Sequence, residues 1–457
     1  MKPLTKEDGL ITEAKRIHMI GIGGSGMCPL AEILHAKGYT LTGSDNNESD
    51  PLARVRKLGI PVVMGQKAEN VHGADLAVYS AAISKDNPER VEAEKLGIPT
   101  MERSHLLGAL TRHFDNVIGV CGTHGKTTTT SMITQIFVMA NREPTAVIGG
   151  KLPLINANGI AGKSEDMICE SCEFVDTFLQ MSPDVAVLLN IDNDHLDYFG
   201  TMERLTESFK TFVDRTHTAF LNGDDVRVKG IAETYHGKAV LFGLSETNTY
   251  YAANIQTGKT GETFDVYHGG EKLAHLELGI PGKHNVYNAL ASFAVAEESG
   301  IDREVTVRAI ETFGGAGRRF EKLGTHGGID FVDDYAHHPT EIKATLSAAK
   351  SMPYGKVIAV FQPFTFSRTE LLKEEFIEAL SIADRVVLTP IMGSREINTT
   401  GISSADLAKG LSHCLLADDF DDVAEKALSL AEPGDVIITM GGGDIYKAAR
   451  KMIALMA

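Results

Sequence analysis

Hydrophobic and polar residues alternate along this chain in short blocks that predict strands and helices in turn. In the first part, strands are expected at residues 16–22, 39–43, 61–64 and 76–80, and a helix at residues 27–37. Strands that alternate with helices form parallel sheets covered by helices. The pattern therefore predicts an α/β domain over residues 1–112.

The rest of the chain repeats this pattern twice. Further strands are expected at residues 117–121, 185–191, 219–221, 239–242, 329–333, 357–361, 385–389 and 435–440, and helices at 128–140, 288–299 and 304–313. Short alternating segments at 263–267 and 275–280 predict a hairpin. Gly314, Gly315 and Gly317 interrupt the pattern and suggest a linker. The fold class is therefore α/β in three domains, at residues 1–112, 113–317 and 318–457.

The strongest chemical signal is a glycine-rich turn between a predicted strand and a predicted helix. Its sequence is Gly122-Thr123-His124-Gly125-Lys126-Thr127-Thr128. Glycines let backbone N–H groups point at a phosphate, and the dipole of the following helix favours anionic oxygen. Lys126 can reach a β- or γ-phosphate, and the Thr127 hydroxyl can bind Mg²⁺. The turn predicts a nucleoside triphosphate site, although Val120 stands where the usual motif begins with glycine.

A second glycine-rich turn follows the first predicted strand. Gly21, Gly23, Gly24 and Gly26 give the pattern G-x-G-G-x-G, and Asp45 lies 19 residues after Gly26. Nicotinamide-dependent oxidoreductases hold the pyrophosphate of a dinucleotide on such a turn. Any other nucleotide diphosphate would fit equally well, and a tight packing turn without a ligand has the same pattern. The residues alone leave these alternatives open.

Two segments of the middle domain carry acidic and histidine residues, and one of them directly follows a predicted buried strand. Glu173 belongs to the segment Glu170-Ser171-Cys172-Glu173, and His195 follows Asp194 directly after the strand at 185–191. Ligands of open parallel sheets bind at the carboxyl ends of strands, so both side chains are expected near the phosphates. Mg²⁺ prefers oxygen ligands, so a capping or core role for His195 stays open.

The last domain carries a similar set of side chains after two successive strands. Asp334, Tyr335 and His337 follow the strand at 329–333, and Arg368 follows the strand at 357–361. Two polar clusters at neighbouring strand ends favour a shared ligand-facing edge over two solvated loops.

Charge and composition narrow the functional classes. The chain has 457 residues and a net charge of −17, with its acidic residues spread along the sequence. A nucleic-acid or membrane-surface binder would need a basic face, so neither partner is expected. The N-terminus lacks an apolar secretory core, no apolar run approaches 18 residues, and the five cysteines are odd in number. We therefore expect a cytoplasmic protein with reduced thiols.

The order of these motifs resembles the Mur ligase family. The matching segments, from the phosphate loop onward, are Gly122–Thr129, Glu170–Glu173, Asn190–His195, Pro281–Asn288, Gly317–Phe320 and Asp333–Pro339. The resemblance extends over nearly the whole chain, from Gly21 to Asp444. Within the family, the pattern is most similar to the ligases that join L-alanine to UDP-N-acetylmuramate.

The resemblance implies a Rossmann-like N-terminal domain for the UDP-sugar, a central P-loop ATPase domain with a mostly parallel sheet, and a Rossmann-like C-terminal domain for the amino acid. It implies that ATP, with Mg²⁺, drives ligation of L-alanine to UDP-N-acetylmuramate through an acyl phosphate. We expect the protein to be a monomer or a weak homodimer.

The resemblance also implies a role for individual residues. The ATP site would comprise Gly122, Thr123, His124, Gly125, Lys126, Thr127, Thr128, Asn288, Arg319 and Asp334. Lys126, Glu173 and His195 would be catalytic, and Thr127, Glu173 and His195 would bind Mg²⁺. The UDP-sugar would bind Gly21, Gly23, Gly24, Ser25, Gly26, Met27, Ser44 and Asp45, and the amino acid would bind Tyr335, His337 and Arg368.

Three positions depart from the family's pattern. Cys172 stands where relatives often carry aspartate, and Phe364 stands where they usually carry histidine. Phe209 occupies the position of a carbamylated lysine in other members, with Lys210 one residue away, so that modification is not predicted.

Three alternative functions remain. A murein peptide ligase would attach a whole peptide to the same sugar nucleotide, and the region 361–368 would decide between the acceptors. An NAD-dependent oxidoreductase built on the Gly21 turn leaves the Lys126 loop unexplained. A regulatory P-loop ATPase would turn over ATP without either of the other substrates.

Overall fold

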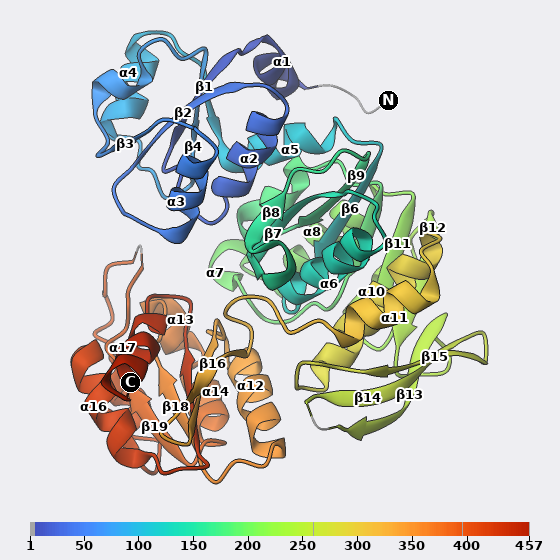
Figure 1. Ribbon diagram of the computed structural model, residues 1–457, viewed down its shortest axis with the longest axis vertical. Helices are drawn as coiled ribbons and strands as arrows, with labels where there is room; N and C mark the ends of the chain where they lie inside the picture. Colours follow the sequence, from blue (N-terminus) through green and yellow to red (C-terminus); the bar gives the residue numbers. More distant parts are fainter. Residues whose placement is uncertain (1–4, 259, 395, 457) are drawn as a thin grey trace. The chain divides into compact units, whose positions relative to one another are not determined.

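Three β-sheets with helices packed on them make up the chain (Figure 1). The structure is a computed structural model that describes residues 5–258, 260–394 and 396–456. The chain forms two compact units. The first contains residues up to Asn254 together with 265–276 and 287–313; the second contains 255–264, 277–286 and the chain from Gly314 onward.

The first sheet has five parallel strands in the order β3-β2-β1-β4-β5. The strands are β1 (Arg16–Ile20), β2 (Thr40–Asp45), β3 (Val62–Met64), β4 (Leu76–Tyr79) and β5 (Thr100–Glu102). The helices are α1 (Lys6–Glu13), α2 (Cys28–Ala36), α3 (Asp50–Lys57), α4 (Pro88–Lys95) and α5 (Arg103–Thr111), with the 3₁₀ turn η1 (Ala68–Val71). The strand order reverses between β1 and β4, and ligands of doubly wound sheets bind at such a point.

The second sheet has ten strands in the order β15-β14-β13-β12-β11-β10-β6-β9-β7-β8. They are β6 (Asn116–Cys121), β7 (Thr145–Leu152), β8 (Ala157–Ile160), β9 (Asp166–Glu170), β10 (Val185–Leu188), β11 (Thr218–Asn222), β12 (Lys238–Gly243), β13 (Tyr250–Thr257), β14 (Glu262–His268) and β15 (Glu271–Glu277). The strands from β7 through β9, β6, β10, β11 and β12 to β13 pair in parallel, and β8 pairs antiparallel with β7.

The helices of this part lie on the ten-stranded sheet and beside its strand ends. They are α6 (Lys126–Met139), α7 (Leu196–Phe199), α8 (Met202–Val213), α9 (Val226–Ala232), α10 (His284–Glu298) and α11 (Arg303–Glu311), with the 3₁₀ turns η2 (Pro153–Ile155) and η3 (Phe174–Gln180). Helix α11 packs against α6 (Figure 1). Helices α2 and α5 of the first sheet contact β7, β8 and η3, and one apolar core is continuous across both sheets.

The third sheet has six strands in the order β16-β17-β21-β18-β19-β20. They are β16 (Glu321–His326), β17 (Ile329–Asp334), β18 (Val357–Phe361), β19 (Arg385–Leu388), β20 (Cys414–Leu416) and β21 (Val436–Met440). Its helices are α12 (Pro339–Ser351), α13 (Phe366–Leu371), α14 (Lys373–Leu380), α15 (Ser404–Ala408), α16 (Phe420–Leu430) and α17 (Tyr446–Met456). Only β16 pairs antiparallel, so the remaining strands form a parallel sheet buried on both faces.

The α/β fold class predicted from the sequence is confirmed, and some element bounds differ. The strand expected at 185–191 ends at Leu188, because the chain turns there into a polar loop. The second strand of the predicted hairpin is β15, at 271–277 rather than 275–280, because Gly269 and Gly270 adopt positive φ and place the turn earlier. None of the described helices is long and apolar enough to cross a membrane.

Candidate active site

The predicted phosphate loop joins β6 to α6 and depends on two glycines. Gly122 has φ +129° and Gly125 has φ +86°, a region that favours glycine. A Cβ on Gly125 would lie 2.5 Å from Asn288 Oδ1, and a Cβ on Gly122 would lie 3.1 Å from the Asn190 backbone. The loop therefore favours glycine at both positions, and the N-terminus of α6 that follows it is suited to an anion.

Lys126 begins α6 and folds back over this loop. Its Nζ donates to the carbonyl oxygens of Gly122 at 2.5 Å and Thr123 at 2.9 Å. It also lies 3.1 Å from Glu173 Oε1 and 3.0 Å from Oε2. Burial lowers the pKa of Lys126, but the surrounding groups, Glu173 first and then Cys172 and Glu170, together raise the pKa above its usual value. Lys126 is therefore positively charged at neutral pH, and its ammonium group is held beside the phosphate loop.

A second carboxylate, Glu170, lies beside Thr127. It ends β9, and its Oε1 accepts a hydrogen bond from Thr127 Oγ1 at 3.1 Å while its Oε2 accepts from the Gly149 amide at 2.8 Å. A Cβ on Gly149 would lie 2.5 Å from this carboxylate, so a larger residue there would displace the Glu170 side chain. Sequence reasoning did not select Glu170, because β9 was not predicted. The signal available was the apolar run Met167–Cys169 that ends in this glutamate.

The loop after β10 carries the other predicted residues of this edge. Asn190 holds His124 through two hydrogen bonds, from His124 N to Asn190 Oδ1 at 2.8 Å and from Asn190 Nδ2 to His124 O at 3.0 Å. His124 Nε2 lies 3.0 Å from Asp192 Oδ2. The chain after β10 is thereby fixed against the phosphate loop, as the two adjacent strand ends predicted.

His195 lies in the same polar loop. Its φ is +58°, its Nε2 lies 3.6 Å from Asp194 Oδ2, and its ring centroid is 4.8 Å from that of Phe174. Phe174 directly follows Glu173 in the chain. The contact therefore connects the loop after β10 with the segment that carries the Lys126 partner.

Two further ATP-site candidates lie on helices of this unit. Asn288, from α10, accepts a hydrogen bond from Thr129 Oγ1 at 3.2 Å and lies against Gly125. Thr128 is buried in the first turn of α6. The structure thus gathers Thr123, Lys126 and Thr127 with Glu173 and Asn288 around one helix end.

Two positions at which this chain departs from the family's pattern, Cys172 and Phe209, carry uncharged side chains. Burial, and then the charge of Glu173, raise the pKa of the Cys172 thiol to about 11, so it is uncharged at neutral pH. Phe209 is fully buried in α8, with its ring 5.5 Å from that of Phe178. Lys210 pairs instead with Asp214 at 2.5 Å.

The glycine turn after β1 is tied to the end of β2. The Gly23 amide donates to Asp45 Oδ2 at 2.9 Å, and the Gly21 amide donates to the Ser44 carbonyl at 2.8 Å. A Cβ on Gly23 would lie 2.9 Å from Leu52, so this glycine is needed for packing. The Ser44 hydroxyl donates to buried Glu89 Oε2 at 2.7 Å and is directed into the domain.

The rest of this turn borders the N-terminus of α2. Gly24 and Ser25 are exposed and Gly26 is half-buried, whereas Met27 is buried and precedes the helix. The Gly24 amide donates to the Gly21 carbonyl at 3.1 Å, whereas the Ser25 and Gly26 amides donate to no backbone carbonyl among the described residues. The Met27 side chain belongs to the core.

In the second unit, Asp334 is the last residue of β17, and Tyr335 and His337 of the predicted amino-acid site follow it in the chain. Its Oδ1 accepts from the Ala336 amide and its Oδ2 from the Phe320 amide, both at 2.7 Å. Burial raises its pKa to about 6, against the opposing effect of Arg319. The Arg319 guanidinium lies 5.2 Å from the centre of the Tyr335 ring.

The other amino-acid-site candidates form an aromatic group. The His337 ring centroid lies 5.2 Å from that of Tyr335 and 5.9 Å from that of Phe364. A Cβ on Gly442 would lie 3.2 Å from the Phe364 ring. Arg368 is half-buried on α13. Phe364, a departure from the family's pattern, is therefore part of the group around His337.

Comparison with known proteins then identifies the family. The family model described as "Mur ligase family, catalytic domain" matches residues 16–115, "Mur ligase middle domain" matches 120–296, and "Mur ligase, glutamate ligase domain" matches 318–443. A curated UDP-N-acetylmuramate–L-alanine ligase from Caldicellulosiruptor bescii is 44% identical over 436 residues, 94% of this chain and 96% of its own. The chain belongs to the Mur ligase family.

Other relatives agree with this membership in the Mur ligase family. A UDP-N-acetylmuramate–L-alanine ligase from Caldanaerobacter subterraneus is 42% identical over 96% of this chain and 97% of its own. The crystal structure of the UDP-N-acetylmuramate–alanine ligase of Thermotoga maritima has a TM-score of 0.83 at 29% identity, over 96% and 98% of the two chains. A murein peptide ligase from Psychrobacter arcticus shares the fold, with a TM-score of 0.76 at 22% identity over 97% and 98%.

Membership also answers questions that the motifs left open. The resemblance to Mur ligases predicted from the sequence is confirmed, and with it an ATP-dependent ligase rather than an oxidoreductase. The domain boundaries and the roles of individual residues stay predictions.

Proposed function

We propose that this Mur ligase joins L-alanine to UDP-N-acetylmuramate and converts ATP to ADP and phosphate. The observation that carries the proposal is the 44% identity, over 94% of the chain, to a UDP-N-acetylmuramate–L-alanine ligase. The acceptor is taken as alanine rather than a whole peptide, because the curated relatives that are 44% and 42% identical are both L-alanine ligases.

The chemistry follows from the weakness of a carboxylate as an acyl donor. A carboxylate oxygen of the muramoyl group attacks the γ-phosphorus of ATP, and ADP leaves. The alanine amine then attacks the acyl carbon of the acyl phosphate, and the tetrahedral intermediate expels phosphate as the amide forms. In both steps the protein supplies chiefly position and charge.

The phosphate loop would bind the ATP phosphates in this reaction. Lys126, at the start of α6, would neutralise the transferred phosphoryl group, and the amides of the first turn of this helix would donate to the phosphates. Asn288 lies against the loop and would contact the nucleotide. Arg319 and Asp334 would approach ATP from the last domain, and Tyr335, His337 and Arg368 would bind the amino acid.

Oxygen ligands at the loop fit a magnesium ion. Thr127 Oγ1 lies within hydrogen-bond distance of Glu170, and the buried carboxylate of Glu173 lies beside the same loop, 3.0 Å from Lys126 Nζ. Mg²⁺ prefers such oxygens, so Thr127, Glu170 and Glu173 would hold it, with His195 as the less usual ligand. When bound, the ion would neutralise charge on the ATP phosphates.

The substrates also suggest where the enzyme acts. ATP and a UDP-sugar are nucleotides of the cytoplasm, so we propose that the protein works there. The prediction of a monomer or a weak homodimer is kept as part of the proposal.

Phosphate release measured with each substrate omitted in turn tests this function. The expected result is release that requires ATP, UDP-N-acetylmuramate and L-alanine together. Release that is independent of the sugar nucleotide and the amino acid would indicate a regulatory ATPase. Faster release with a tripeptide than with L-alanine would indicate a murein peptide ligase.

A further inference from the structure

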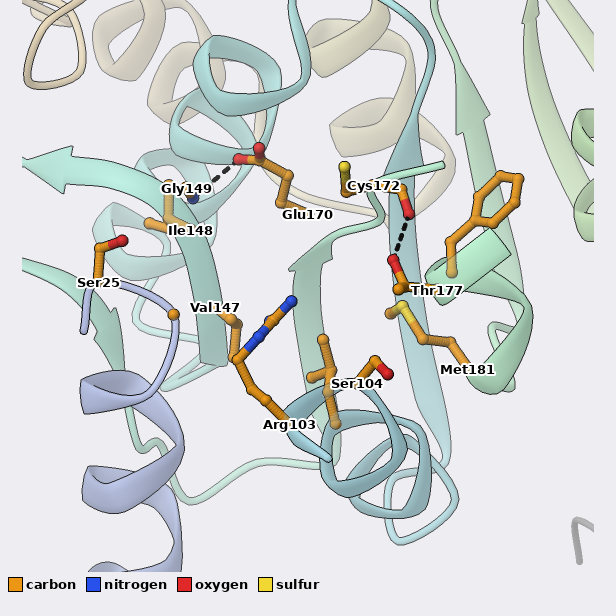
Figure 2. Close-up of a pocket in the computed structure, with 13 residues that line it drawn as sticks. Ser25, Arg103, Ser104, Val147, Ile148, Gly149, Glu170, Cys172, Thr177 and Met181 are labelled. Carbon is orange, nitrogen blue, oxygen red and sulfur yellow. Dashed lines mark hydrogen bonds between the residues drawn. The ribbon is translucent and has the colours of Figure 1, made fainter. Parts of the chain in front are cut away.

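A pocket of about 290 Å³ lies between the glycine turn after β1 and the strands β7 and β9 (Figure 2). Its lining includes Ser25 and Gly26 of the turn, and Gly149 and Glu170 of the two strands. Arg103, the first residue of α5, is also part of the lining. The pocket therefore connects the predicted UDP-sugar turn with the carboxylate that contacts the phosphate loop.

The Arg103 side chain points into this pocket (Figure 2). It is half-buried, and no side chain or carbonyl of the described residues makes a hydrogen bond or ion pair with its guanidinium. Glu170, the other charged residue of the lining, is engaged by Thr127 and the Gly149 amide. A guanidinium that points into a pocket and has no protein partner can bind an anion that arrives from outside the chain.

The glycine turn supplies further donors beside Arg103. A Cβ on Gly26 would lie 3.3 Å from Arg103 Cδ and 3.4 Å from Nε and Nη1, so the guanidinium lies alongside the turn. The amides of Ser25 and Gly26 donate to no backbone carbonyl of the described chain. They lie just before α2, whose N-terminus favours negative charge. The Arg103 guanidinium and the backbone amides of Ser25 and Gly26 therefore lie close together at the edge of the pocket.

We propose that Arg103 binds the diphosphate of the UDP-sugar, together with the amides of Ser25 and Gly26. The inference rests on the proposed function, which supplies the ligand. The diphosphate is favoured over the muramoyl carboxylate because the guanidinium lies against Gly26 of the turn. The planar fork of arginine matches two phosphate oxygens, and lysine would retain the charge without the fork.

Arg103→Gln tests this role. The variant is expected to raise KM for UDP-N-acetylmuramate on the order of 10- to 100-fold, the effect of losing a charged hydrogen-bonded pair. KM for ATP and kcat at saturation are expected to stay near the unaltered values. Arg103→Lys should recover part of the loss. Arg308→Gln, on the exposed surface of α11, removes the same charge and should leave all three constants unchanged.

Titration calorimetry with UDP as the probe identifies the anion. If Arg103 binds the diphosphate, Arg103→Gln weakens the binding of UDP and of UDP-N-acetylmuramate by the same factor. Weakened binding of UDP-N-acetylmuramate with unchanged UDP binding would overturn the proposal in favour of the muramoyl carboxylate. Unchanged binding of both would overturn it outright. If the unaltered protein binds neither UDP nor UDP-N-acetylmuramate, this result would overturn the proposed function, and the inference about Arg103 with it.

Discussion

The buried ion pair between Lys126 and Glu173 gives a sharp prediction about the phosphate loop. The Glu173 side chain is 1% exposed and the Lys126 side chain 13%. Lys126→Met would leave the carboxylate buried opposite an apolar chain and would remove the donor to two loop carbonyls. Removing one partner of a buried pair costs about 3–5 kcal/mol of the free energy of unfolding.

A second substitution separates this cost from catalysis. In Lys126→Met/Glu173→Gln no charge is left unpaired, so most of the lost stability should return, with a coupling of about 2–3 kcal/mol. Turnover should not return, because no cation faces the transferred phosphoryl group. Both variants are expected to lose on the order of 10³-fold or more in kcat.

Two assays measure these effects. Urea denaturation without nucleotide gives the free energy of unfolding of the unaltered protein, both single variants and the double variant. Coupled release of ADP gives turnover for the same four proteins. Additive losses of stability would refute the ion pair as described, and turnover by the double variant near the unaltered rate would refute the role of Lys126.

Two further predictions concern backbone conformation and pH. Gly125→Ala should lower the free energy of unfolding by about 1–3 kcal/mol and weaken ATP binding, because φ is +86° and the added Cβ would lie 2.5 Å from Asn288 Oδ1. Gly230→Ala in α9, where a Cβ would meet nothing within 4 Å, should instead raise the free energy of unfolding by about 0.5–1 kcal/mol. Equal urea midpoints for the two variants would contradict this prediction. Burial raises the pKa of Asp334 from 3.8 to about 6, so its stabilisation is complete below the unfolded pKa and is lost as pH rises through about 6. Relative to Asp334→Asn, the free energy of unfolding of the unaltered protein should fall by about 2 kcal/mol between pH 4 and pH 8. A constant difference across that range, measured in urea, would be inconsistent with this pKa.

Much of the fold could be predicted because the hydrophobic pattern of the strands and the glycine-rich turns between elements indicate the same boundaries. The apolar run before Gly122 and the helix after Lys126 are both observed, at β6 and α6. The strands at 145–152 and 157–160 were not predicted, because glycine and proline interrupt their apolar pattern and their stability comes from pairing with β9 and with each other. Their absence from the prediction also concealed the pocket they help to form.

The sequence could indicate a candidate site where the motif is local, but not where the contacts join residues that are distant in the chain. The turn from Gly122 to Thr127 carries its own chemistry. Glu170 acquires its position through Thr127 and Gly149, and Arg103 through Gly26, and neither pairing follows from sequence spacing. The hydroxyl of Ser44 is directed into the interior by Glu89, which no local pattern shows.

The central claim is that the γ-phosphoryl group of ATP activates the muramoyl carboxylate. The most direct measurement uses UDP-N-acetylmuramate with both carboxylate oxygens labelled with ¹⁸O, and follows the label by mass spectrometry of the released phosphate. One ¹⁸O atom in each phosphate molecule formed is the predicted result, because the bridging oxygen of the acyl phosphate leaves with phosphorus. Phosphate that carries no ¹⁸O, while the amide product still forms, would contradict the account.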